Sequence, residues 1–138
     1  MSARRFLDTN ILLYSISREP AEADKRARAL DLIDEGDCGL SVQVLQEFYV
    51  QATRPTRRDP LRHETAAGLI ETWMRFPVQD NTVAILRDAL MIRARHRFSY
   101  WDSAIVAAAK SLGCRELMSE DLSDGQLIEG ITLVNPFK

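Results

Sequence analysis

The feature that most constrains this chain is a short apolar stretch near its N-terminus that contains one acid and one amide. Apolar residues occupy positions 6–7 before Asp8 and positions 11–13 after Asn10, so the acid lies between two core-forming segments. Burying a lone carboxylate is costly. Two interpretations remain open. Either Asp8 or Thr9 caps a helix that begins at Asn10, or Asp8 lies at the carboxyl end of a parallel strand and faces a cation.

Strand-like segments alternate with longer helical patterns along the rest of the chain. Besides the strand before Asp8, strands are predicted at 39–41, 76–78, 116–119 and 131–134. Helices are predicted at 20–35, from Ser41 to Ala52, from an Asp59 cap with Pro60 in the first turn to Met74, from Thr82 to the arginines before Phe98, and at 103–112. Strands separated by helices favour right-handed crossovers and a parallel sheet. We therefore predict an α/β protein, a three-layer α/β/α sandwich with a central, mostly parallel sheet.

Composition is consistent with a single domain that spans residues 1–138. The chain has 138 residues, 46% of them hydrophobic, which is enough for one continuous core. It has no apolar run of the roughly 20 residues that a membrane span requires and no signal peptide, so we expect a cytoplasmic protein without a membrane partner. Cys38 and Cys114 are far apart in sequence and are expected to be reduced, structural thiols.

Acidic side chains follow predicted strands or open predicted helices on what should be one edge of the sheet. Asp8 follows the first strand, Asp102 opens a helix, and Asp121 follows a later strand. In a parallel sheet, strand ends and the following helix starts share an edge, so these acids should converge. Asp102 also has a structural explanation, because Ser99 and Asp102 have the spacing of a capping box. The two roles are compatible.

Converging carboxylates repel one another, so such a cluster favours a bound cation. Oxygen ligands select Mg²⁺ or Mn²⁺, and the two histidines and two cysteines are too scattered for a zinc site. With these metals the expected reaction is phosphodiester hydrolysis. The sequence contains no phosphate-binding loop, dinucleotide glycine motif or serine elbow, and Asn10 stands where an aspartyl-phosphate phosphohydrolase needs a second aspartate.

A net charge of −2 argues against binding nucleic acid by overall electrostatics, so phosphate contacts must be local. Two basic clusters could supply them. The first is in a proline-broken loop and the second is at a helix end; they comprise Arg54, Arg57, Arg58, Arg62 and His63, and Arg93, Arg95, His96 and Arg97. The alternative for each cluster is structural: a solvated face, or cations that stabilise a helix C-terminus.

Four segments of the chain form a recognisable set: the strand into Asp8-Thr9-Asn10, the Ser41 helix with Gln46-Glu47, the helix start Tyr100-Trp101-Asp102-Ser103-Ala104, and Ser119-Glu120-Asp121. Together they make the chain resemble the PIN domain family, specifically the VapC-like toxin ribonucleases of type II toxin–antitoxin pairs. Helical periodicity alone places Glu47 off the apolar face of its helix and predicts that it is solvated. The resemblance instead makes Glu47 a site residue.

The resemblance implies an acidic quartet of Asp8, Glu47, Asp102 and Asp121 that holds Mg²⁺, with Asn10 and Ser119 as polar neighbours. Relatives often carry asparagine at the position of Asp121 and an aspartate three residues later. Asp124 matches that aspartate, and either or both can serve as the fourth acid.

The expected function is a Mg²⁺-dependent endoribonuclease that cleaves single-stranded or looped RNA, with the arginines at the rim of its cleft. The resemblance further implies a homodimer and an antitoxin that inserts a basic side chain near the acids. Tyr49 or Trp73 could serve the dimer or belong to the core. Two alternatives remain open: a PIN nuclease of RNA processing without an antitoxin, and a catalytically silent domain that binds RNA or a partner through its arginines.

Overall fold

A computed structural model describes residues 3–138. In chain order its elements are β1 (Arg5–Leu7), α1 (Thr9–Ser15), the 3-10 turn η1 (Pro20–Glu22), α2 (Ala23–Glu35), β2 (Cys38–Ser41), α3 (Val42–Thr53), α4 (His63–Trp73), β3 (Val78–Gln79), α5 (Val83–His96), α6 (Tyr100–Ser111), β4 (Glu116–Met118), β5 (Leu127–Ile128) and β6 (Ile131–Val134). No helix in this part of the chain is long and apolar enough to cross a membrane.

The strands form one six-stranded sheet in the order β3-β2-β1-β4-β6-β5. All neighbouring pairs are parallel except β5 with β6. Strand β1 lies between β2 and β4, and Phe6 and Leu7 on it are completely buried. The prediction of a mostly parallel central sheet is therefore confirmed, and Asp8 follows one of its central strands.

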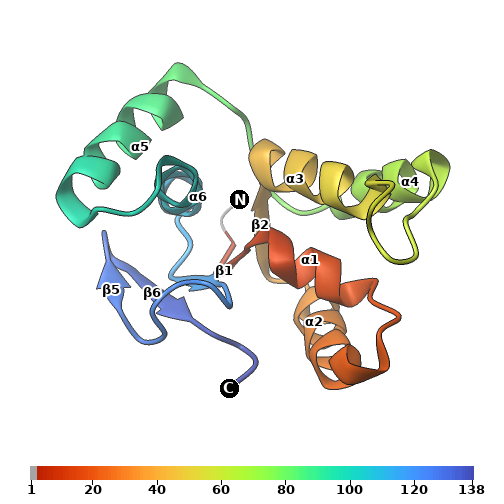
Figure 1. The fold of residues 1–138 in the computed structure, drawn as a ribbon. Helices are drawn as coiled ribbons and strands as arrows, with labels where there is room; N and C mark the ends of the chain where they lie inside the picture. Colours follow the sequence, from red (N-terminus) through yellow and green to blue (C-terminus); the bar gives the residue numbers. More distant parts are fainter. Residues whose placement is uncertain (1–2) are drawn as a thin grey trace.

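Helices cover both sides of this sheet (Figure 1). Helix α6 packs on β2, β3, β4 and β6, and α5 packs against the outside of α6. On the other side, α2 and α3 contact β2, while α1 packs against both of them and α4 lies against α3. This arrangement is the predicted three-layer sandwich. It places the N-termini of α1, α3 and α6 near the carboxyl ends of β1 and β2.

Two predicted helix starts are confirmed by hydrogen bonds to the backbone, whereas the helix predicted at 103–112 begins three residues earlier, at Tyr100. Ser41 Oγ accepts from the Val44 N–H at 3.2 Å, and Thr82 Oγ1 accepts from the Ile85 N–H at 3.1 Å. Gly36 ends α2 in the left-handed conformation that glycine favours.

The predicted helix start at Asp59 and Pro60 is wrong. Helix α4 begins at His63, and Asp59 has a positive φ of 56°, so it forms a turn and does not cap the helix. The Leu61 N–H donates to the carbonyl of Ala52 at 2.8 Å. This bond holds the segment against the end of α3, so the next helix begins only at His63.

Of the two roles left open for Trp73, the structure shows the core role. Trp73 is 4% exposed and its ring meets that of Phe48 edge to face, with centroids 4.8 Å apart. Trp73 is therefore unavailable to a dimer interface, and of the two aromatic candidates only the half-buried Tyr49 remains.

Candidate active site

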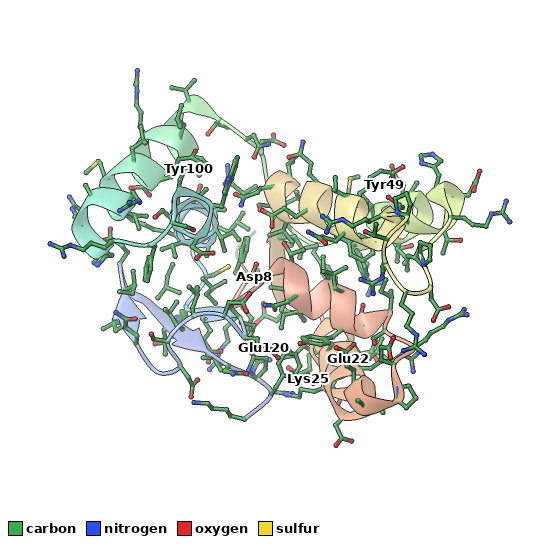
Figure 2. The ribbon with its side chains drawn as sticks, viewed as in Figure 1. Asp8, Glu22, Lys25, Tyr49, Tyr100 and Glu120 are labelled. Carbon is green, nitrogen blue, oxygen red and sulfur yellow. The ribbon has the colours of Figure 1, made fainter. Side chains whose placement is uncertain are left out.

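The centre of the candidate site is Asp8, which is 6% exposed. Its carboxylate caps α1, because Oδ1 accepts from the Thr9 N–H at 2.7 Å. Its other oxygen accepts from the Ser119 hydroxyl at 2.7 Å, and Ser119 directly follows β4. The cap and the strand-end position expected for Asp8 are thus both present, and α1 begins one residue earlier than predicted. Figure 2 shows Asp8 near the middle of the molecule.

The charge on Asp8 is poorly compensated by the protein. Burial raises its pKa from 3.8 to about 6; the hydrogen bonds from Ser119 and Thr9 oppose this rise, and the negative charges of Asp102 and Glu47 add to it. A carboxylate in this position gains most from a nearby cation, because a cation offsets both desolvation and repulsion.

Glu47 is half-buried and faces α1, so the solvated position predicted from periodicity is wrong. The Thr9 hydroxyl donates to Glu47 Oε2 at 3.2 Å, and the Gln43 amide donates to Glu47 Oε1 at 2.7 Å. Helices α1 and α3 pack together here, and this contact is what periodicity within α3 alone cannot reveal. The placement beside Asp8 agrees with the resemblance.

Asp102 lies in the first turn of α6 and is half-buried. Its N–H donates to Ser99 Oγ at 3.1 Å, which confirms Ser99 as the cap of this helix. Among residues 3–138, no donor is bonded to the Asp102 carboxylate itself. It therefore remains open toward Asp8, whose pKa it raises.

The structure separates the two candidates for the fourth acid. Asp121 Oδ2 accepts from the Asn10 side-chain amide at 3.0 Å, and the Asp121 N–H donates to Ser119 Oγ at 3.2 Å. Asp124 instead accepts from the Asn135 N–H at 2.8 Å and lies 4.0 Å from the Lys138 ammonium. Asp121 is therefore linked to the two predicted polar neighbours of the site, whereas Asp124 is bonded to the C-terminal segment.

The donor set fits a hard divalent cation. Every candidate ligand is an oxygen, and Asn10 Oδ1 is a buried acceptor without a hydrogen-bond partner in the part of the chain described. Within that same part, no three Asp, Glu, His or Cys side chains are close enough to form a ready metal cage. Repulsion between uncompensated carboxylates favours such an open arrangement.

Sequence reasoning missed several residues that position the acids. Thr9 and Gln43 hold Glu47, and the spacing of Gln43 and Glu47 on one helix was the available signal. Beside Asp121, Glu120 accepts from the Tyr14 hydroxyl at 2.7 Å and from the Lys25 ammonium at 2.6 Å. Glu120 and Lys25 lie next to each other in Figure 2. No sequence signal connects Lys25, on α2, with the loop after β4.

The Glu120 network fixes the loop that carries Asp121. Burial raises the pKa of Glu120, but the hydrogen bonds from Lys25 and Tyr14 outweigh it and leave the pKa below its usual value. Phe137 packs edge to face on Tyr14, with ring centroids 5.0 Å apart. The network therefore joins α1, α2, the Asp121 loop and the C-terminal segment.

In each predicted basic cluster, two members form ion pairs with acids among residues 3–138. Arg95 lies 3.4 Å from Glu129, which also accepts from His96 and Lys110. The hydrogen bonds from His96 and Lys110 lower the pKa of Glu129 to about 2. In the other cluster, Arg58 pairs with Glu19 at 3.3 Å. For Arg54, Arg57, Arg93 and Arg97, no ion pair is formed with residues 3–138.

A family model of the PIN domain matches residues 5–123. The chain therefore belongs to the PIN domain family, as its sequence motifs predicted. The matched range includes Asp8, Glu47, Asp102 and Asp121.

Solved structures of toxin–antitoxin proteins have the same fold. The chain is similar to a toxin–antitoxin complex from Klebsiella pneumoniae, with 19% identity, a TM-score of 0.71, and coverage of 96% of this chain and 97% of that one. It is similar to VapC20 of Mycobacterium tuberculosis, a toxin that cleaves the sarcin-ricin loop, with 20% identity, a TM-score of 0.66, and coverage of 85% and 91%. It is also similar to DNA-bound VapBC from Salmonella typhimurium, with 21% identity, a TM-score of 0.64, and coverage of 95% and 96%. No protein with a curated description matches the sequence.

Proposed function

We propose that this PIN domain is a Mg²⁺-dependent endoribonuclease and the toxin of a toxin–antitoxin pair. The observation that carries the proposal is the buried Asp8, whose pKa is raised to about 6 by burial and by two further acids at one sheet edge. Such a group is destabilising unless a cation offsets its charge, and clustered carboxylates with shifted pKa values mark functional sites.

Asp8, Glu47, Asp102 and Asp121 would hold the metal, which can be Mg²⁺ or Mn²⁺. When bound, the metal orients and activates water and stabilises charge on the attacked phosphate. Thr9 and Ser119 fix the orientation of Asp8, and Asn10 does the same for Asp121. The side chains of Thr9 and Gln43 hold Glu47, so that three of the four acids are positioned before substrate arrives.

Calorimetric titration with MgCl₂ tests this proposal against a catalytically silent domain. Wild-type protein should bind Mg²⁺, and Asp8→Asn should bind it much more weakly because the buried charge is gone. Asp31→Asn, at an exposed position on α2, is the matched control and should bind like wild type. Absence of Mg²⁺ binding to the folded wild-type protein would support the silent domain.

We propose single-stranded or looped RNA as the substrate, because its backbone can bend into a small acidic cleft while the bases of a regular duplex stay stacked. In a protein with a net charge of −2, arginines at the rim must attract the phosphates. The candidates for this role are Arg93, Arg95 and Arg97 near the Asp102 helix, and Arg54, Arg57 and Arg58 in the loop before α4.

Replacing both Arg95 and Arg97 by alanine should weaken RNA binding while Mg²⁺ affinity stays near that of wild type. Each lost phosphate contact should reduce the slope of log K against log salt concentration by about 0.7 for a single strand. Glu129→Gln is the matched control, because it removes the partner of Arg95 but keeps both cations. An unchanged salt slope in the double variant would show that Arg95 and Arg97 do not contact the RNA phosphates, and Arg54, Arg57 and Arg58 would become the candidates.

We propose an antitoxin and a second copy of the chain as partners, and the solved toxin–antitoxin complexes with this fold support an antitoxin. An apolar hollow of about 760 Å³, lined by residues such as Leu45, Tyr49 and Met74, contains none of the four site acids in its lining and could bind a partner segment. Growth arrest on expression, relieved by a neighbouring gene product, would support the toxin role; active enzyme without arrest would refute it. A monomer mass at all concentrations in sedimentation would exclude the dimer.

A further inference from the structure

The start of α6 exposes a large aromatic side chain beside the acids. Trp101 directly precedes Asp102 and is 64% exposed. This exposure is unusual, because tryptophan has the largest apolar side chain. The Tyr100 ring packs against it edge to face, with centroids 5.1 Å apart and planes at 78°. The indole is thus supported by a neighbour while most of its surface faces solvent.

A hollow of about 380 Å³ opens next to this ring. Its lining consists of Trp101, Glu47 and three glutamines: Gln43, Gln46 and Gln51. The Gln43 amide donates to Glu47 at 2.7 Å and to the Trp101 carbonyl at 3.3 Å, so the helix start and the acid are held together. The hollow therefore borders the acidic site at Glu47 and is lined by amides that can both donate and accept hydrogen bonds.

We propose that Trp101 and the glutamine-lined hollow form a binding subsite for one unpaired RNA base next to the cleaved phosphate. Aromatic side chains bind unstacked bases through their π faces, and amide side chains bind the polar base edges. Trp101 also borders a second hollow of about 420 Å³ whose lining includes Val83, Leu86 and Ala104; the base is assigned to the hollow that contains Glu47, because the amides there can bind the polar edges of a base. The inference rests on the proposed nuclease function, because it places the base relative to the phosphate at Asp102 and Glu47.

The test is a double-mutant cycle on a single-stranded RNA whose cleavage site has been mapped. Abasic nucleotides are placed singly at each position around the cut, and kcat/KM is measured for wild type and Trp101→Ala. Loss of one base stack should lower kcat/KM about 10-fold, mainly through KM. At one position the abasic substrate and Trp101→Ala should be strongly non-additive, because each removes the same contact. Additive effects at every position would overturn the proposal.

Two further variants separate stacking from loss of structure. Trp101→Phe should retain most of the affinity, and Leu127→Ala, which removes a 68% exposed side chain on β5, should match wild type. If Trp101→Ala cleaves RNA like wild type but changes the sedimenting mass, the ring belongs to a protein interface and the subsite is refuted.

Fluorescence provides a readout that does not require catalysis. In Trp73→Phe protein, Trp101 is the sole tryptophan, because the chain contains two. Titration with the same RNA in EDTA should quench its emission, and the abasic RNA with the critical base removed should quench it less. Quenching without any Mg²⁺-dependent cleavage would support the subsite and refute the nuclease function. Cleavage without quenching would support the nuclease function and refute the subsite.

Discussion

Replacing Asp8 or Asp102 by asparagine is expected to abolish RNA cleavage, with a loss of at least about 100-fold, the scale seen when one group that stabilises developing charge is removed. Asparagine keeps the side-chain shape, and in Asp8→Asn its carbonyl can still accept from the Thr9 N–H. The charge that would hold the metal is lost. Cleavage assays on purified variants, with folding checked by circular dichroism, provide the measurement.

The same assay compares the two candidates for the fourth acid. Asp121→Asn should reduce cleavage more than Asp124→Asn, because Asp121 is bonded to Asn10 beside the site and Asp124 is bonded to the C-terminal segment. Asp31→Asn should retain full activity. Retained cleavage in Asp8→Asn or Asp102→Asn, once host nucleases are excluded, would refute the assignment of these acids.

Asp8→Asn should also stabilise the metal-free protein at neutral pH. The pKa of Asp8 is about 6 in the folded protein and 3.8 ordinarily, so the folded state binds the proton more tightly. The Asp8 contribution to the free energy of unfolding therefore falls as pH rises from about 4 to 6. About 2 pKa units correspond to roughly 3 kcal/mol, and weaker hydrogen bonds of asparagine to Ser119 should leave a gain of about 1–2 kcal/mol.

Urea denaturation in EDTA between pH 4 and pH 7 measures this effect. The difference in unfolding free energy between Asp8→Asn and wild type should grow through this range, and contributions from acids that do not interact with Asp8 cancel in the difference. Saturating Mg²⁺ should raise the stability of wild type and leave that of Asp8→Asn nearly unchanged. A difference that does not vary with pH would show that Asp8 is not the poorly compensated charge described here.

The parts of the fold that were predictable from sequence are those set by local chemistry. The capping oxygens of Ser41, Thr82 and Ser99 mark real helix starts, because each accepts a hydrogen bond from the first turn. Asp59 followed by Pro60 has the same appearance, yet a tertiary hydrogen bond from Leu61 to Ala52 determines the course of that segment. Local signals alone cannot distinguish these cases.

The candidate site was predictable to a similar extent. Asp8, Asp102 and Asp121 could be placed at one edge from strand and helix order, since the topology of a parallel sheet dictates that edge. Glu47 could be placed only by resemblance, because its position depends on how α3 packs against α1. The partnership of Lys25 with Glu120 joins segments 95 positions apart and leaves no periodic signal in either.

The most direct test of the account is cleavage of a single-stranded RNA by purified protein at increasing MgCl₂ concentration, with Asp8→Asn protein purified in parallel. We expect cleavage that requires Mg²⁺, stops on addition of EDTA, and is absent from the variant. Cleavage of equal rate in wild type and Asp8→Asn, or a folded wild-type protein that binds Mg²⁺ and single-stranded RNA but does not cut it, would contradict the nuclease assignment.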